Sequence, residues 1–237
     1  MNDEKKAAVE KALAKVANPI RASHSQRFFK TGKGEYGEGD QFLGVTVPDQ
    51  RTVARQYREL ALAEIKRLLA SKIHEHRLTA LFILVMRYKK AKTPAQKQTL
   101  VKFYLDNRSK INNWDLVDSS APYILGDYLL DTNRHILDEL VRSKIVWDRR
   151  IAVVATFKFI DVGDFADSFH LAEILLTDQH DLIQKAVGWM LREIGKRDQN
   201  AERFWLDKHY QKMPRTMLRY AIEKFPPALR QSYLKVK

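Results

Sequence analysis

The sequence predicts an all-α fold, a HEAT-like repeat solenoid of stacked antiparallel helical hairpins with a basic concave face. Three observations lead to this prediction. Apolar residues recur with helical spacing along nearly the whole chain, no segment alternates as a strand does, and basic residues recur about 35 positions apart. We expect a single domain over residues 1–237, interrupted by a glycine-rich loop at 30–48.

The helical spacing is clearest between His74 and Lys90. One apolar stripe there is formed by Leu78, Leu81, Phe82, Leu84 and Val85. The same periodicity predicts helices over residues 3–17, 49–70, 94–107, 122–130, 134–143, 147–160, 166–176, 181–196, 199–210 and 214–225. Short connections containing proline or aspartate separate these segments, as expected for stacked hairpins.

A weak internal repeat supports the solenoid. The dipeptide Trp-Asp occurs at 114–115 and again at 147–148, and basic residues in alanine-rich helices follow one another at Arg150, Lys185 and Arg219. A period near 35 with two helices per unit is typical of HEAT-like repeats. Because the second helix of each repeat lines the concave face, residues one period apart are expected to form a row on that face.

Composition limits the possible functions. Lys and Arg number 42 against 29 Asp and Glu, which gives a formal net charge of +13 that favours phosphate backbones as partners. Without cysteine the chain has no disulfide and no thiol nucleophile. His74 and His76 lie two positions apart, on different helix faces, so we expect no metal site and no cofactor.

The expected setting is the cytoplasm. No apolar run approaches the roughly 20 residues of a membrane span, and the polar N-terminal segment does not resemble a signal peptide. Nothing in the sequence indicates an obligate protein partner, and we expect a monomer whose partner is double-stranded DNA.

The glycine-rich loop holds five of the nine glycines and matches neither a P-loop nor a dinucleotide-binding turn. One interpretation is a plain connection between helices. The other is a loop whose backbone amides, together with Lys30 or Lys33, approach phosphate groups.

The segment from Asn112 to Pro122 holds the candidate chemistry. If the turn there is helical, Trp114 and Asp118 lie side by side at i and i+4. If the period also holds, Arg150 and Trp189 join them on one concave surface. The structural alternative makes Asp115 an N-cap with Asp118 at N3 and places Trp114, Trp147 and Trp189 in the core. It makes Arg150 one half of an ion pair between repeats.

Three extended motifs carry a family resemblance. They are NWDLVDSSAPYILG, WDRRIAVVATF and LIQKAVGWMLREIGK, and with them roughly residues 20–225 resemble the DNA alkylation repair family, specifically the AlkD-like DNA glycosylases. The resemblance implies an all-helical HEAT-like enzyme that removes cationic N3- and N7-alkylated purines from duplex DNA without flipping the base. It implies a monofunctional hydrolase of N-glycosyl bonds that acts in base excision repair.

The same resemblance assigns roles to individual residues. The family's catalytic aspartate matches Asp118, its two cleft tryptophans match Trp114 and Trp189, and its arginine at the DNA backbone matches Arg150. Lys185, one helical turn before Trp189, is a further candidate for DNA contact.

The chain also departs from the family pattern. A cleft tyrosine falls at Phe28, which has no hydroxyl, and a glutamine falls near Thr46. The glycine-rich insertion is longer than in the best-known members. These departures bear on lesion geometry and substrate range.

Three rival functions stay open. Related branches of the family bind unusual or branched DNA without excision, and a HEAT-like scaffold could bind an acidic protein. A bifunctional glycosylase and lyase would need a Schiff-base lysine, for which Lys185 is the nearest candidate.

Overall fold

A computed structural model describes residues 2–235, in which the regular secondary structure is helical apart from one isolated bridge between Gln41 and Ile73. The prediction of an all-α protein is therefore confirmed, whereas the HEAT-like stacking and the basic concave face stay predictions. The contacts divide the chain into two compact units, residues 1–120 and 121–237. Whether 1–237 behaves as the expected single domain stays a prediction. No helix of the described residues is long and apolar enough to cross a membrane.

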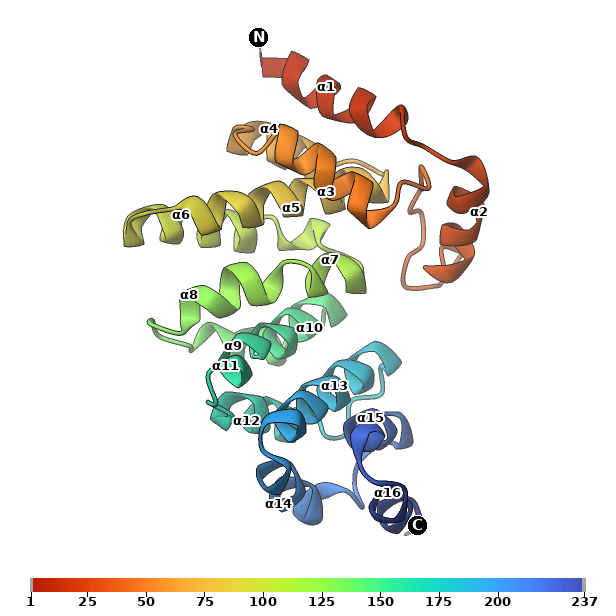
Figure 1. Cartoon of the computed structure of the whole chain (residues 1–237), viewed down its shortest axis with the longest axis vertical. Coiled ribbons are helices and arrows are strands. Elements are labelled where there is room, and N and C mark those ends of the chain that lie inside the picture. Colours follow the sequence, from red (N-terminus) through yellow and green to blue (C-terminus); the bar gives the residue numbers. More distant parts are fainter. Residues whose placement is uncertain (1, 236–237) are drawn as a thin grey trace. The chain divides into compact units, whose positions relative to one another are not determined.

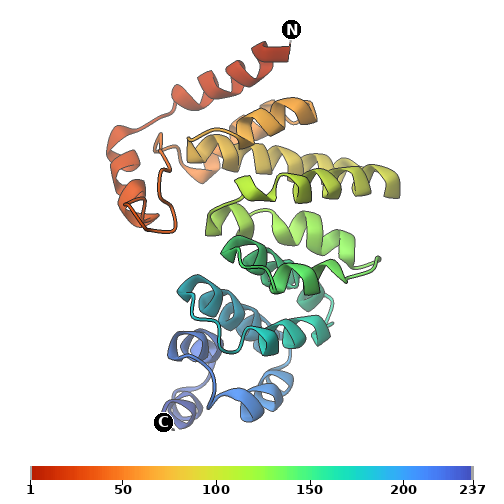
Figure 2. The same ribbon diagram turned by 180° about the vertical axis from the view of Figure 1, so that it is seen from behind.

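The first unit is built around a long buried helix. Its elements are α1 (Asn2–Ala14), α2 (Pro19–Phe28), α3 (Val47–Gln56), α4 (Leu62–Leu69), α5 (His74–Lys90), α6 (Pro94–Asp106), the 3-10 turn η1 (Arg108–Lys110) and α7 (Trp114–Asp118). Helices α3, α4, α6 and α7 all pack on α5. Figures 1 and 2 show these helices in successive layers, with α2 and the loop after it along one end of the layers.

The second unit is centred on α13 (Asp181–Arg197). The other elements are the π-helical η2 (Pro122–Gly126), α8 (Asp127–Leu129), α9 (Ile136–Val141), α10 (Val146–Ala155), α11 (Phe157–Asp161), α12 (Ala166–Ile174), α14 (Gln199–His209), α15 (Arg215–Ala221), the 3-10 turn η3 (Ile222–Lys224) and α16 (Pro227–Lys235). Helix α13 contacts α10, α11, α12, α14 and α15, so its position fixes the centre of this unit.

Two helices begin with the same turn. Residues 71–77 read SKIHEHR before and into α5, and residues 143–149 read SKIVWDR before and into α10. In both, the serine hydroxyl accepts from the amide two positions later at 3.1 Å. In both, the arginine six positions later donates to the serine carbonyl, at 3.1 and 2.9 Å respectively. The starts of α5 and α10 therefore share the same local hydrogen bonding.

The helix boundaries correct the sequence analysis in several places. The single helix expected over 147–160 is two helices, α10 and α11, with Thr156 between them. The single helix expected over 49–70 is two helices, because the chain turns at 57–61. That turn is closed by the Leu60 amide, which donates to the Tyr57 carbonyl at 2.9 Å, and the Arg87 guanidinium holds the Leu60 carbonyl from α5. Helices α2 and α16 were not predicted, although Asn18 and Pro19 form a regular helix start at α2.

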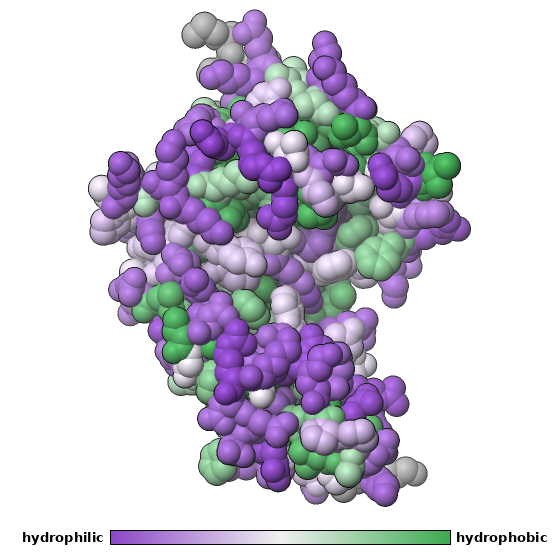
Figure 3. Space-filling model, viewed as in Figure 1, coloured by the Kyte–Doolittle hydropathy of each residue, from purple (hydrophilic) through white to green (hydrophobic). Residues whose placement is uncertain are grey.

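The surface is mostly polar. Figure 3 shows one face on which hydrophilic residues dominate and hydrophobic ones form small, separate patches. The large apolar side chains that stay exposed in the described part are Val16, Ile20, Phe28, Val47, Tyr123, Ile145, Val162 and Phe204. Of these, only Phe28 is also a residue that the sequence analysis assigned to a site.

Candidate functional site

The short helix α7 carries the residues that sequence analysis placed at the centre of the site. Asn113 caps it, because its side-chain oxygen accepts from the Trp114 amide at 2.8 Å. Since α7 spans Trp114–Asp118, the expected helical turn is present, and helical periodicity puts these two end residues on one face. Both side chains are half-buried, so each keeps part of its surface open to solvent.

The structural alternative for this segment is wrong in its details. Asn113, not Asp115, is the N-cap, and Asp118 is the last residue of α7 rather than its third. A carboxylate at the C-terminal end of a helix is not stabilised by the helix dipole, so capping does not account for Asp118.

An aromatic cluster surrounds the indole of Trp114. The ring of Phe29 stacks on it at 5.3 Å between centroids, and the ring of Phe28 meets it edge-on at 6.0 Å. Phe29 also stacks on Phe42 at 5.1 Å, so the cluster continues from Trp114 through Phe29 into the glycine-rich loop. Phe28, which the sequence analysis aligned with a cleft tyrosine, is 65% exposed and is the outer ring of this cluster.

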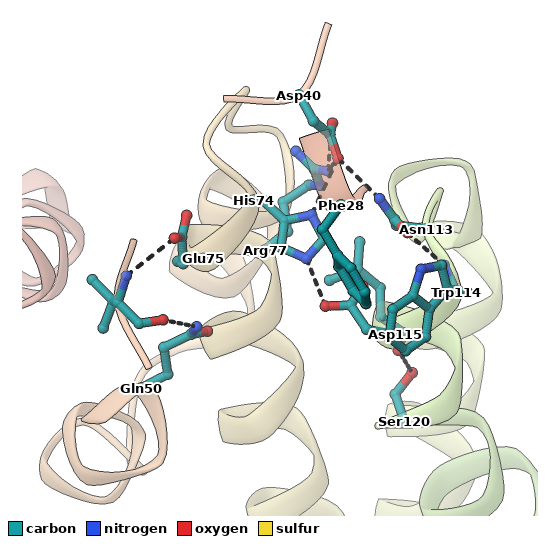
Figure 4. A network of polar contacts seen from close by, with 12 residues as sticks. Phe28, Asp40, Gln50, His74, Glu75, Arg77, Asn113, Trp114, Asp115 and Ser120 are labelled. Carbon is teal, nitrogen blue, oxygen red and sulfur yellow. Dashed lines mark hydrogen bonds and ion pairs between the residues drawn. The ribbon is translucent and has the colours of Figure 1, made fainter. Parts of the chain in front are cut away.

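A buried charged network lies behind the aromatic cluster (Figure 4). The two ring nitrogens of His74 contact two carboxylates, Asp115 at 2.7 Å and Asp40 at 3.1 Å. Arg77 donates to both oxygens of Asp40 at 2.7 Å, and the Asn113 amide also reaches Asp40 at 3.4 Å. The network therefore joins the glycine-rich loop, α5 and the start of α7.

The surroundings set the charges of this network. Burial alone would lower the pKa of His74, but the charge of Asp115 and the hydrogen bonds to Asp115 and Asp40 outweigh it and raise the pKa to about 9. Burial would raise the pKa of Asp40, but the hydrogen bond from His74 and the charge of Arg77 hold it below its usual value. At neutral pH the imidazole is therefore an imidazolium between two carboxylates.

The loop is also fastened to α5 next to this network. The carboxylate of Glu75 accepts from the amides of Leu43, Gly44 and Val45, the shortest at 2.7 Å. Gly44 has φ +75°, and a Cβ there would lie 2.2 Å from the carbonyl oxygen of Asn18. Only glycine fits this crossing of two chain segments, which explains the glycine at this point of the loop.

Two buried hydroxyl groups, those of Tyr104 and Ser120, lie near Asp118. Tyr104 is fully buried and its hydroxyl is 3.1 Å from that of Ser120, which donates in turn to the Leu116 carbonyl at 2.6 Å. Burial and the nearby negative charge of Asp118 both raise the pKa of Tyr104, against the lowering by Ser120. Tyr104 thus stays a neutral hydroxyl close to the Asp118 carboxylate.

The remaining loop candidates have mixed surroundings. Lys30 and Lys33 are exposed. The hydroxyl of Thr46 caps α3 by accepting from the Asp49 amide at 3.3 Å. The amides of Gly32 and Gly34 are occupied, because Glu35 and Glu38 accept from them at 2.8 Å each. If this loop contacts phosphate groups, as one of its two interpretations holds, it does so through the lysines rather than through these two amides.

The second unit holds the other candidates. Arg150 on α10 is 5% exposed, and its guanidinium donates to the Leu182 carbonyl in the first turn of α13 at 2.6 Å. Lys185 is half-buried and pairs with Asp181 at 2.6 Å. The structural alternative made Arg150 one half of an ion pair between repeats, and the structure shows its guanidinium bound to a main-chain carbonyl of the next long helix.

Trp189 lies on the same helix as Lys185 and is half-buried. Its indole N–H donates to Glu193 at 3.0 Å, and its ring lies 5.9 Å from that of Phe157. Trp147, by contrast, is 8% exposed and belongs to the core. The structural reading of the tryptophans thus holds for Trp147, while Trp114 and Trp189 keep part of their surface accessible.

Each unit gathers some of the candidates. Trp114, Asp118 and Phe28 belong to the first unit, and Arg150, Lys185 and Trp189 to the second. The convergence of both sets on one surface stays a prediction.

Four residues of the buried network were not predicted from sequence, namely Asp40, His74, Asp115 and Arg77. The signal that could have indicated them is the polar run at 74–77, which stands at the start of an apolar helix. Among residues 4–235, no group of three or more metal-ligating side chains is present.

Comparisons with known proteins agree with this architecture. A family model described as DNA alkylation repair enzyme matches residues 9–225. A solved structure described as a predicted DNA alkylation repair enzyme from Enterococcus faecalis superimposes with a TM-score of 0.71 over 89% of this chain and 97% of that one, at 15% identity. At that identity the superposition shows a shared fold. No curated protein matches the sequence.

Proposed function

Because the chain belongs to the DNA alkylation repair enzyme family, we propose that it is a monofunctional DNA glycosylase. Its substrate is duplex DNA carrying N3- or N7-alkylated purines, and the reaction hydrolyses the N-glycosidic bond without flipping the base. The observation that carries the proposal is α7, which holds the Trp114 indole and the Asp118 carboxylate at the two ends of one helical turn, both half-buried.

The chemistry suits these residues. An alkylated purine that is already cationic leaves without a general acid, so the enzyme needs only to stabilise the positive charge that develops on the sugar. A carboxylate 4 Å from that charge contributes about 4 kcal/mol at an effective dielectric of 20, or roughly three decades in rate. In this proposal Asp118 supplies the carboxylate and orients the attacking water.

The surrounding side chains have supporting roles in the proposal. Trp114 and Trp189 pack around the deoxyribose and exclude water. The proposed DNA-binding surface is a HEAT-like, basic concave face, in line with the net charge of +13. Its basic residues attract the phosphates of the DNA backbone, and they are Arg150, Lys185, Lys30 and Lys33. Phe28 extends the apolar wall of Trp114, and Thr46 contributes by capping α3 at the end of the loop.

Asp118→Asn tests the proposal directly. The substitution keeps the shape of the side chain and removes its charge. We expect release of 7-methylguanine or 3-methyladenine to fall by roughly 10² to 10³, with DNA affinity and melting temperature nearly unchanged. The control is Asp106→Asn on α6, an exposed carboxylate paired with Lys102 at 2.9 Å, which should leave excision intact. Full activity in Asp118→Asn, or efficient release of the neutral base uracil, would refute this mechanism.

Two observations favour a second candidate, a non-catalytic binder of unusual DNA structures. Phe28 has no hydroxyl at the position of the cleft tyrosine, and the guanidinium of Arg150 is largely buried against the Leu182 carbonyl. If no alkylated base is released while branched DNA binds more tightly than plain duplex, this second function is the correct one.

A further inference from the structure

One buried imidazole contacts the end of α2, the glycine-rich loop and α7, all of which lie close to Trp114. His74 is the first residue of α5 and is 2% exposed. Its ring stacks at 4.7 Å on Phe42 and lies 4.9 Å from Phe29, while its two nitrogens contact Asp115 on α7 and Asp40 in the loop. These contacts reach across 41 and 34 positions of the chain, so they fix tertiary rather than local structure.

The contact with Asp115 acts close to the proposed chemistry. Asp115 follows Trp114 directly and precedes Asp118 by three positions on the five-residue helix α7. A helix this short makes few hydrogen bonds of its own, so its orientation depends on what holds it from outside. The hydrogen bond from His74 to Asp115 therefore also sets the orientation of Trp114 and Asp118.

Only the charged imidazole can donate a hydrogen bond to both carboxylates at once. A neutral imidazole has one N–H and can donate to one carboxylate, whereas the imidazolium donates to two. The charged groups that face His74 are Asp115 from α7, Asp40 from the loop and Arg77 from its own helix. Arg77 also binds Asp40, which leaves Asp115 dependent on His74 for its short 2.7 Å bond.

We propose that His74 is a positioning residue for the excision reaction: its imidazolium, held between Asp40 and Asp115, locks α7 against the glycine-rich loop so that Trp114 and Asp118 meet the lesion in the reactive geometry. The proposal rests on the function proposed above and adds a residue to it. His74 itself does not touch the substrate.

The chain offers a matched control two positions away. His76 is on the same helix and is 4% exposed, but it contacts the Ser71 hydroxyl at 3.0 Å and Glu10 of α1 at 3.3 Å. A general loss of α5 stability would follow from His76→Gln as well as from His74→Gln. Only His74→Gln removes the contact with Asp115 on α7.

The experiment measures single-turnover excision and duplex DNA affinity for the wild type, His74→Gln, Asp115→Asn, the double variant and His76→Gln. We expect His74→Gln and Asp115→Asn each to slow excision roughly 10- to 100-fold, with DNA affinity within about threefold of the wild type. The double variant should lose no more than the worse single variant, because both break one contact. His76→Gln should excise normally.

The pH profile separates positioning from plain support. The ratio of the His74→Gln rate to the wild-type rate cancels the ionisation of the substrate. Because the pKa of His74 is raised to about 9, the wild type should lose rate as the pH rises through that value, while His74→Gln should not. A ratio that does not change between pH 7 and 9.5, with equal losses in His76→Gln, would overturn the proposal.

A second measurement does not depend on excision. The indole N–H resonance of Trp114, identified with Trp114→Phe, should shift in His74→Gln and should titrate near pH 9 in the wild type. The resonances of Trp147, Trp189 and Trp205 should stay in place. If no variant or wild-type sample releases a base, the proposed function fails, and a Trp114 resonance that still follows His74 supports the coupling. An unshifted Trp114 resonance refutes the coupling whether or not the protein is an enzyme.

Discussion

Gly188 on α13 lies directly against the main chain of Met217 on α15. A Cβ atom at Gly188 would come within 2.5 Å of the Met217 carbonyl oxygen and 2.6 Å of the Tyr220 Cβ. The two helices therefore pack at a distance that only glycine allows, and the neighbour of this glycine is Trp189.

Gly188→Ala should destabilise the protein. Helix propensity alone would favour alanine by about 1 kcal/mol, but the overlap with α15 should cost about 1–3 kcal/mol and win. We expect a graded fall in melting temperature from glycine to alanine to serine, measured by thermal unfolding. A higher melting temperature for Gly188→Ala would show that the two helices can separate without cost.

DNA binding should be strongly salt-dependent. With a net charge of +13, log K for duplex DNA should fall steeply with log salt, independently of sequence. Arg150→Ala should weaken binding and lower the slope by about one phosphate contact. Because this guanidinium also holds the Leu182 carbonyl, the melting temperature must be measured beside it.

The control for this prediction is Arg142→Ala. Its guanidinium is exposed and makes a 3.5 Å contact with Asp138, so its loss removes the same formal charge from the same unit. Equal slopes for both variants would show that Arg150 has no specific contact with DNA. A slope near zero in the wild type would instead favour the scaffold function.

Lys30 and Lys33 should contribute to DNA affinity without supporting the fold. Both are exposed in the glycine-rich loop, so Lys30→Gln with Lys33→Gln should weaken DNA binding and leave the melting temperature within about 1 °C. A deletion of residues 32–40 is a poorer test, because it removes Asp40 from the buried network. Unchanged affinity in the double variant would leave the loop as a plain connection.

Glu202 should make stability depend on pH. Its side chain is buried against Gly195, and burial raises its pKa to about 8, against a lowering by the charge of Arg192. A carboxyl group with a raised folded pKa stabilises the protein below its ordinary pKa of 4.5 and loses that contribution as the pH rises towards 8. Glu202→Gln should therefore be more stable than the wild type at pH 8, by on the order of 2–4 kcal/mol, and similar at pH 5. Parallel stability curves between these pH values would contradict the buried acid.

The helices whose apolar residues recur regularly were predictable from sequence. Segment 74–90 matches α5, and the start predicted at 94 coincides with a full capping box at Thr93 and Gln96. The irregular segments were not. The break between α3 and α4 contains neither glycine nor proline, and a guanidinium from α5 holds it, so no local signal marks it.

The sequence by itself determined the family, the all-helical fold and the presence of Trp114, Asp118, Arg150 and Trp189, because these depend on residue types in a fixed order along the chain. Only the tertiary structure decided which carboxylate binds the buried imidazole. Asp115 and Asp118 look alike in sequence, yet it is Asp115 that His74 binds, from 41 positions away, while Asp118 is the half-buried last residue of the same helix. The reason is physical: the charge state of His74 comes from burial and from two carboxylates that folding brings to its ring, and neither exists in the unfolded chain.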